Sequence, residues 1–206
     1  MTKRFFDIMF SILVLTILSP IFLIIAFLIK LTSNGPVFFT QIRLGKNARS
    51  FKIYKFRTMI SRADAESNNL TLLDDRRITK IGKILRRHKL DELPQFVNVL
   101  KGDMSIVGPR PDVPEYYDLN NPLHKKVLSL RPGITCFASI EYSLKHKPKE
   151  TAMLAQADQP EKLYVQKIFP AKMALNIKYV DEQSIWLDIK LISLTIYYLI
   201  LKIRNS

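Results

Sequence analysis

The chain has 206 residues, enough for one domain with a sizeable core and an accessory segment. Its 32 lysines and arginines against 18 acidic residues give a net charge of +14, which favours a polyanionic partner such as nucleic acid, an anionic membrane or a phosphorylated substrate. The single cysteine, Cys136, excludes an internal disulfide and a cysteine-based zinc cluster, and the three histidines lack metal-ligand spacing.

The first predicted element is the uncharged apolar segment of residues 8–29, long enough to cross a bilayer as a helix. Ser19 and Pro20 interrupt its middle, where proline kinks a helix, and the hydroxyls of Thr16 and Ser19 are candidate partners for the freed carbonyls. Basic residues flank both ends, and such flanks prefer the cytoplasmic side. The pattern favours a re-entrant helix over a spanning one. A cleaved signal peptide and a buried core helix are the alternatives.

The next segments predict a β-hairpin followed by a polar loop. Residues 37–42 and 51–56 are rich in β-forming side chains, and residues 45–47 between them have the composition of a turn. Residues 61–75 are polar and predict a loop, with a short helix at residues 63–66 as an option.

Helical spacing dominates the rest of the chain. Residues 78–88 and 93–100 show apolar residues at helical intervals, and the second helix is predicted to end at Gly102. The proline-rich residues 107–114 predict extended backbone. Residues 150–183 favour helix with breaks at Pro160 and Pro170. Residues 185–203 predict an amphipathic helix that is either packed on the domain or interfacial.

These elements predict an α+β fold. It is a mainly helical compact domain with a short β-hairpin, carried on an N-terminal re-entrant membrane helix and on amphipathic interfacial helices. The expected division places the membrane helix in residues 1–32 and a cytoplasmic catalytic domain, with its C-terminal interfacial helix, in residues 33–206.

The candidate chemistry lies at Asp91 and Glu92, just before Pro94. Proline fits the first turn of a helix, so Asp91 is expected at or just outside the N-cap, where the helix N-terminus would keep its carboxylate ionised. Two adjacent carboxylates among cations indicate a phosphate and a divalent metal, and a carboxylate is also a nucleophile. A plain helix cap and a solvated basic surface are the alternatives.

Five motifs in order resemble the bacterial sugar transferase family, whose small members are monotopic phosphoglycosyl transferases acting on undecaprenyl phosphate. The motifs are YKFRTM (54–59), LDELPQ (90–95), NVLKGDMS (98–105), VGPRP (107–111) and RPGIT (131–135). The likeness runs from the N-terminal apolar segment to residues 187–190, and Ser19-Pro20 matches the kink of the family's re-entrant helix. The chain length resembles the family's minimal catalytic form.

The resemblance implies roles for individual residues. Asp91 matches the nucleophile that attacks a UDP-sugar and expels UMP, and Glu92, with Asp91, matches the Mg²⁺ site. Lys55, Arg86 and Arg110 match the basic residues around the substrate phosphate. The lipid phosphate then takes the phosphosugar from Asp91, which starts glycan assembly on the cytoplasmic face of the bacterial inner membrane.

Two departures from the family pattern stand beyond residue 111. Residues 136–142 replace a stretch that often carries an arginine, and Asn176 stands where relatives often have aspartate. A non-catalytic membrane scaffold is the alternative function. A nucleic-acid binder is suggested by charge alone and has no motif, and the sequence leaves a homo-oligomer open.

Overall fold

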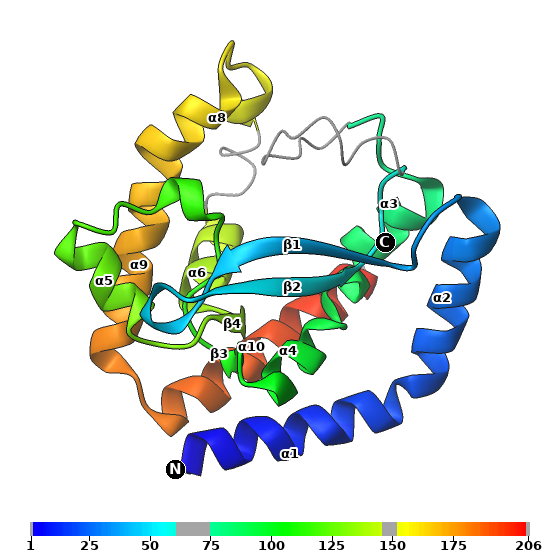
Figure 1. Ribbon diagram of the computed structural model, residues 1–206, viewed down its shortest axis with the longest axis horizontal. Coiled ribbons are helices and arrows are strands. Elements are labelled where there is room, and N and C mark those ends of the chain that lie inside the picture. Colours follow the sequence, from blue (N-terminus) through cyan, green and yellow to red (C-terminus); the bar gives the residue numbers. More distant parts are fainter. Residues whose placement is uncertain (1, 61–74, 146–151, 205–206) are drawn as a thin grey trace.

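The computed structural model describes residues 2–60, 75–145 and 152–204. Figure 1 shows the β-hairpin across the middle of the molecule, with helices around it. In chain order the helices and strands are α1 (Thr2–Ile17), α2 (Ser19–Thr32), β1 (Phe38–Leu44), β2 (Ser50–Phe56), α3 (Lys80–Arg87), α4 (Gln95–Lys101), β3 (Ser105–Val107), α5 (Pro122–Leu128), β4 (Gly133–Thr135), α6 (Phe137–Lys145), α8 (Pro160–Leu163), α9 (Phe169–Glu182) and α10 (Ile185–Arg204). The helical majority and the small hairpin confirm the α+β class.

The N-terminal segment is a bent helix pair, as predicted. Helices α1 and α2 meet at an angle of 61°, and Pro20 lies in the first turn of α2, where its missing N–H costs no hydrogen bond. The hydroxyl of Ser19 donates to the carbonyl of Thr16 at 2.8 Å. Among the described helices none is long and apolar enough to cross a membrane alone, whereas this bent pair meets that measure together.

Both ends of the bent pair are attached to the rest of the chain. Helix α1 packs on α4 along the lower edge of Figure 1, and α2 rises at the right towards α3. Ile25 and Ile29 of α2 form a buried cluster with Phe56 and Leu85. The middle of the pair instead exposes large apolar side chains, among them Leu13, Ile17, Leu23 and Ile24.

The hairpin forms where the sequence predicted it. Strands β1 and β2 pair antiparallel, with Phe38 opposite Phe56 and Leu44 opposite Ser50. Helix α4 is attached to the edge of β2 through Asn98, which is fully buried. Its side-chain oxygen accepts from the N–H of Tyr54 at 2.9 Å, and its amide donates to the carbonyl of Lys52 at 2.7 Å.

A second sheet was not predicted. Strands β3 and β4 have three residues each and pair in parallel, with Ser105 opposite Gly133. The predicted extended stretch of residues 107–114 therefore starts within β3. Gly108 and Gly133 pack backbone to backbone, since a Cβ on Gly133 would lie 2.1 Å from the nitrogen of Gly108.

The C-terminal third is helical, but one predicted break is wrong. The chain continues from α8 through a π-helical turn at Tyr164–Ile168 directly into α9, so Pro170 does not interrupt the helix. A π turn shifts hydrogen bonding to i→i+5 and removes the need for an N–H at the proline. The predicted break at Pro160 is confirmed, because residues 156–159 are not helical and α8 begins at Pro160.

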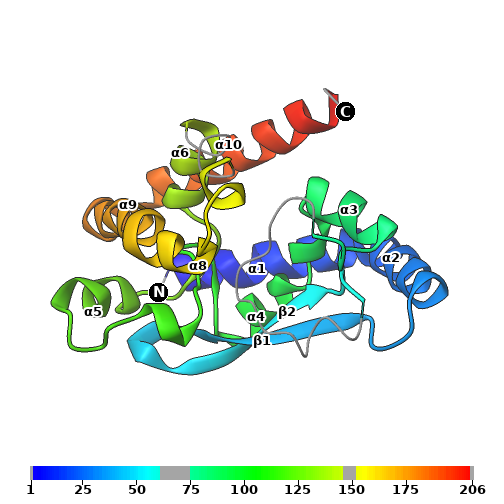
Figure 2. The same ribbon diagram turned by 90° about the horizontal axis from the view of Figure 1, so that it is seen from above.

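Helix α10 forms over the segment predicted to be helical, residues 185–203. Figure 2 shows it on the opposite side of the molecule from the hairpin, with α1 and α4 between them. Leu191 is buried against the central core, whereas Trp186 is 81% exposed. The helix is thus amphipathic, and its place at a membrane surface remains a prediction. The division at residue 32 between a membrane helix and a catalytic domain also remains a prediction. The short helix considered for residues 63–66 lies outside the described residues.

Candidate active site

Asp91 and Glu92 lie in a single 3₁₀ turn, Leu90–Glu92, between α3 and α4. Lys89 enters this turn with a left-handed backbone (φ 59°), which lets the chain reverse after α3. The N-cap of α4 is Pro94, so Asp91 precedes the helix by a full turn. The predicted N-cap role of Asp91 is therefore wrong.

Glu92 is the centre of a cluster of three cations. The ammonium of Lys55 donates to its Oε1 at 3.0 Å, a guanidinium nitrogen of Arg110 lies 3.6 Å from the same oxygen, and the ammonium of Lys89 lies 4.0 Å away. Burial alone would raise the pKa of Glu92, but the three cations outweigh it and hold that pKa well below its usual range. Glu92 is therefore ionised at neutral pH.

Asp91 has the opposite environment. The residue is 8% exposed, and its Oδ1 is buried without a hydrogen-bond partner among the described residues. Burial and the neighbouring Glu92 raise the pKa of Asp91, against the attraction of Lys55, Lys89 and Arg86. A helix terminus was expected to hold this carboxylate ionised, which would lower its pKa; burial and the like charge of Glu92 shift the pKa in the opposite direction.

Lys55 and Arg110 reach Glu92 from two separate elements. Lys55 lies near the C-terminal end of β2, and Arg110 lies in the loop after β3. Burial lowers the pKa of Lys55 in spite of the attraction of Glu92. Glu92 raises the pKa of Arg110 above its ordinary value. Sequence positions 55, 92 and 110 thus meet as one ionic cluster.

Arg86 lies beside this cluster on α3. Its Nε donates to the hydroxyl of Thr58 at 2.8 Å, and its charge attracts that of Asp91. Gly82 lets α3 approach closely, since a Cβ there would lie 2.0 Å from the carbonyl oxygen of Thr58. Arg86 is therefore near Asp91 and acts on it through its charge, while the ion pairs of the described residues include none from its guanidinium to Asp91 or Glu92.

The donor set fits a metal that takes few protein ligands. Within the described residues no three His, Cys, Asp or Glu side chains gather as a metal cage. The buried, unpartnered Oδ1 of Asp91 offers one hard oxygen ligand beside the carboxylate of Glu92. Mg²⁺ characteristically binds through one or two carboxylates together with substrate phosphates, so these two residues suit it.

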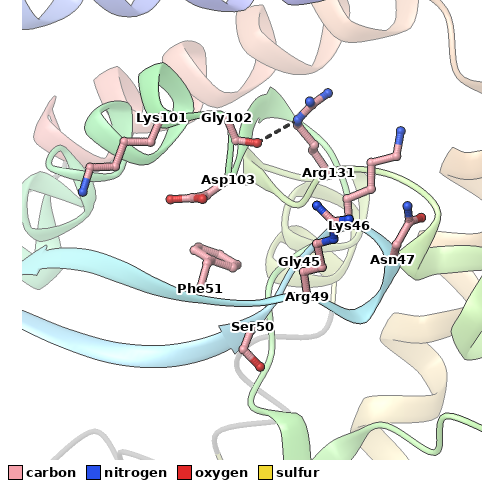
Figure 3. A pocket seen from close by; sticks show the side chains of 10 residues that line it. All are labelled: Gly45, Lys46, Asn47, Arg49, Ser50, Phe51, Lys101, Gly102, Asp103 and Arg131. Atoms are coloured by element: carbon pink, nitrogen blue, oxygen red, sulfur yellow. Dashed lines mark hydrogen bonds between the residues drawn. The ribbon is translucent and has the colours of Figure 1, made fainter.

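A basic pocket lies at the other end of the hairpin (Figure 3). It contains none of the predicted site residues, and its charged members partly serve the fold: Arg131 Nε donates to the carbonyl of Gly102 at 2.8 Å, and Lys101 donates to the hydroxyl of Tyr54. The lining residues are Gly45, Lys46, Asn47, Arg49, Ser50, Phe51, Lys101, Gly102, Asp103 and Arg131.

Two contributors to the site region were missed by sequence reasoning. Lys89 was not singled out, although its i,i+3 spacing to Glu92 is the signal that would have found it. Arg57 was not among the predicted site residues, yet it is buried and donates to the carbonyls of Ser33 and Asn34, each at 2.9 Å. Arg57 thereby fixes the end of α2 to the strand that carries Lys55.

The two departures from the family pattern have structural places. Cys136 is buried before α6, and its sulfur accepts from the N–H of Ser139 at 3.1 Å, so it caps the helix. Burial raises the pKa of this thiol. Asn176 is buried in α9, and its side-chain oxygen has no hydrogen-bond partner among the described residues.

Fold and site together define a basic protein with paired carboxylates among buried and half-buried cations, preceded by a bent apolar helix pair. Residues 1–202 match the family described as bacterial sugar transferase. The chain belongs to that family.

Three relatives give the family match its detail. A UDP-glucose:undecaprenyl-phosphate glucose-1-phosphate transferase of Klebsiella pneumoniae is 37% identical over 95% of this chain and 39% of its own length. A UDP-N-acetylgalactosamine-undecaprenyl-phosphate N-acetylgalactosaminephosphotransferase of Aeromonas hydrophila is 35% identical over 94% of this chain and 42% of its own. The chain thus spans about two fifths of these relatives. It covers 85% of the uncharacterized sugar transferase EpsL of Bacillus subtilis, at 37% identity.

Proposed function

We propose that this protein is a phosphoglycosyl transferase that moves a sugar-1-phosphate from a UDP-sugar to polyprenyl (undecaprenyl) phosphate in bacterial polysaccharide assembly. The observation that carries the proposal is the buried carboxylate of Asp91, one oxygen of which has no hydrogen-bond partner in residues 2–60, 75–145 and 152–204. It lies beside an ionised Glu92 and four basic side chains. The names of two relatives describe the same class of reaction. Their similarity covers more than nine tenths of the present chain.

In the first step, an oxygen of Asp91 attacks the sugar-bearing phosphorus of the UDP-sugar. The bond from that phosphorus to the bridging oxygen breaks, and UMP leaves with this oxygen, so the phosphosugar remains joined to Asp91 through an acyl-phosphate bond. Lys55, Arg86 and Arg110 bind the non-bridging phosphate oxygens and offset their repulsion of the carboxylate. The fork of Arg110 suits two phosphate oxygens at once.

In the second step, an oxygen of the polyprenyl phosphate attacks the same phosphorus. The bond to Asp91 breaks, the carboxylate is restored, and polyprenyl-diphosphate-sugar is released. Because the two substrates use one phosphorus in turn, a single set of cations serves both steps. This two-step course predicts ping-pong kinetics.

Asp91 and Glu92 would hold a Mg²⁺ ion, which supplies charge neutralisation at the diphosphate when bound. Glu92 also keeps Lys55 and Arg110 together, so its charge orders the cations whether or not the metal is present. Activity is therefore expected to disappear in excess chelator and to return on addition of Mg²⁺. Full activity in excess chelator would contradict a metal role for Asp91 and Glu92.

The bent helix pair would place this site at the cytoplasmic face of the bacterial inner membrane. Large apolar side chains cover the outer side of α1 and α2, and basic residues flank both ends of the pair, a distribution typical of cytoplasmic flanks. The exposed Trp186 of α10 is of the residue type enriched at membrane interfaces. A polyprenyl phosphate would present its headgroup at that level.

A transfer assay tests the function directly. Membranes containing the protein are supplied with UDP-glucose, UDP-galactose or UDP-N-acetylgalactosamine labelled in the sugar, and label is measured in the lipid extract. We expect transfer from at least one donor by the native chain and none by Asp91→Asn. Transfer by homogeneous Asp91→Asn would contradict the nucleophile assignment, and absence of transfer with every donor would favour a non-catalytic scaffold.

A further inference from the structure

The start of α1 carries a buried carboxylate that the proposed chemistry does not use. Asp7 is 2% exposed although it belongs to an apolar helix. Its two oxygens accept from the hydroxyl of Ser105 at 2.8 Å and from the N–H of Ile106 at 3.2 Å. A buried carboxylate is retained at low cost only with such partners, so Asp7 joins the helix specifically to β3.

A second polar route joins the same two elements. The ammonium of Lys3 pairs with Asp188 of α10. Asp188 also accepts from the hydroxyl of Tyr179 at 2.7 Å, and that hydroxyl lies 3.3 Å from the carbonyl oxygen of Val107 in β3. Helix α1 is thus tied to β3 directly by Asp7 and indirectly through α10 and α9. We call Lys3, Asp7, Asp188 and Tyr179 the clasp.

The loop that carries Arg110 has its own attachments. The N–H of Gly108 donates to the carbonyl of Thr135 at 3.1 Å, and the N–H of Gly133 donates to that of Pro109 at 2.9 Å. The two glycines also pack backbone to backbone. Loosening the clasp would therefore leave this loop in place beside Glu92 and would free α1 instead.

The face of α1 away from the clasp is apolar and exposed. Phe5, Met9 and Leu13 expose 68%, 51% and 55% of their surface, one helical turn apart along the axis. If this face lies in lipid, the clasp fixes how far the bilayer stands from β3 and from the reacting carboxylate. A misplacement of about 1 Å between reacting groups is enough to cost about 100-fold in rate.

We propose that the clasp positions the membrane helix so that the lipid phosphate reaches Asp91, and that Asp7 is its central positioning residue. This inference rests on the proposed two-step transfer. The first step needs only a soluble UDP-sugar, whereas the second needs a headgroup held in the bilayer. The clasp therefore serves the second step and not the first.

The experiment compares the two steps in vesicle-reconstituted protein. Exchange of labelled UMP into the UDP-sugar measures the first step. Transfer of labelled sugar to polyprenyl phosphate measures the two steps together. Asp7→Leu removes both hydrogen bonds without adding a polar group. Asp7→Asn keeps them, because its oxygen accepts from Ile106 N–H and its amide donates to the Ser105 hydroxyl. Asp181→Asn, which neutralises an exposed carboxylate paired with Lys126 elsewhere on α9, is the matched control.

We expect Asp7→Leu to lower lipid transfer at least tenfold, about the loss a sub-ångström misplacement gives, while UMP exchange changes less than about twofold. Asp7→Asn should restore most of the transfer, and the Asp181→Asn control should match the native protein. Lys3→Met, which opens only the second route, should lower transfer in the same direction. It serves as the test where Asp7→Leu does not fold.

Equal loss of exchange and transfer in these variants would overturn the positioning role, because general destabilisation affects both steps alike. Unchanged transfer in Asp7→Leu and Lys3→Met would overturn it as well. Absence of UMP exchange in the native protein would instead contradict the proposed function, and the two failures are thus distinguishable.

Discussion

At the residue scale, Asp91 and Glu92 are neighbours with opposite electrostatics. Glu92 is stabilised as an anion by Lys55, Lys89 and Arg110, whereas Asp91 is buried and one of its oxygens lacks a hydrogen-bond partner in the part of the chain that the structure describes. One carboxylate therefore organises the cations, and the other keeps the reactivity of a poorly solvated anion. A division of roles between adjacent carboxylates follows from their different environments.

The raised pKa of Asp91 predicts a pH dependence of the first step. Because only the ionised carboxylate attacks phosphorus, the rate of UMP exchange should fall as pH decreases through this pKa, at a higher pH than for an exposed aspartate. A pH–rate profile of UMP exchange measures this. An acidic limb at the pH of an ordinary exposed aspartate would contradict the buried environment of Asp91.

The same shift predicts the effect of Asp91→Asn on stability. A group whose pKa is higher in the folded than in the unfolded state stabilises the fold below its unfolded-state pKa, and this contribution is lost as pH rises through the folded-state pKa. At neutral pH, far above the unfolded-state pKa, the buried carboxyl of Asp91 therefore opposes folding, and Asp91→Asn should raise the free energy of unfolding. Denaturant titration at neutral pH checks the sign, with Asp181→Asn as the exposed control.

Arg110 gives a test of geometry at constant charge. Arg110→Lys keeps a cation near Glu92 but loses the planar fork that holds two phosphate oxygens. We expect the rate of transfer to fall at least tenfold, which corresponds to about 1.4 kcal/mol in the transition state. Native kinetics in this variant would show that Arg110 serves only as a counter-charge for Glu92.

At the element scale, Gly82 fixes the distance between α3 and the end of the hairpin. A methyl group there would lie 2.0 Å from the carbonyl oxygen of Thr58, so Gly82→Ala should move α3 and break the bond from Arg86 to Thr58. We expect a destabilisation of about 1–3 kcal/mol from overpacking, although alanine is the better helix former. Transfer should fall with it. Lys83→Ala, on the exposed side of the same helix, should leave both quantities unchanged.

The elements that could be predicted from sequence are those with local signals. The hairpin and the helices around residues 80–87 and 95–101 follow from residue patterns within a single segment. The parallel pairing of β3 with β4 could not be predicted, because each strand has three residues and its partner is far along the chain. The π turn before Pro170 was missed because a proline ordinarily signals a helix break.

The sequence predicted which residues form the candidate site, whereas the direction of their pKa shifts could not be predicted. The motifs identified Lys55, Arg86, Asp91, Glu92 and Arg110, and the structure brings them to one place. The direction of the pKa shift of Asp91 depends on burial, which arises only when three elements close around the turn. The clasp carboxylate Asp7 was passed over because its partners lie about half the chain away.

At the scale of the whole molecule, both ends of the bent helix pair are held by the same domain. Asp7 attaches the start of α1, and Arg57 attaches the end of α2. Cysteines placed at Thr2 and Thr32, in a Cys136→Ser background, should therefore lie on one side of the membrane. Both should resist an impermeant thiol reagent in intact cells and react after the cells are opened.

Labelling of the Thr2 cysteine alone in intact cells would show a spanning helix and would contradict the re-entrant arrangement. The two threonines are both exposed, so unequal reaction after opening the cells would show a local effect and not topology. Replacement of Ser19-Pro20 by Ala-Leu removes the kink residues. We expect only a partial inversion of the N-terminus, because Lys3 and Arg4 oppose it.

The clasp also has a consequence for the order of events during biosynthesis. Lys3 and its partner Asp188 are separated by 185 residues, which a ribosome adds in roughly 10–40 s at about 5–20 residues per second. For most of that interval the apolar helix pair has been synthesised, whereas its partner residue Asp188 has not. Such long-range contacts form late, so the nascent helix is expected to meet lipid or a chaperone first and to dock on the finished domain afterwards.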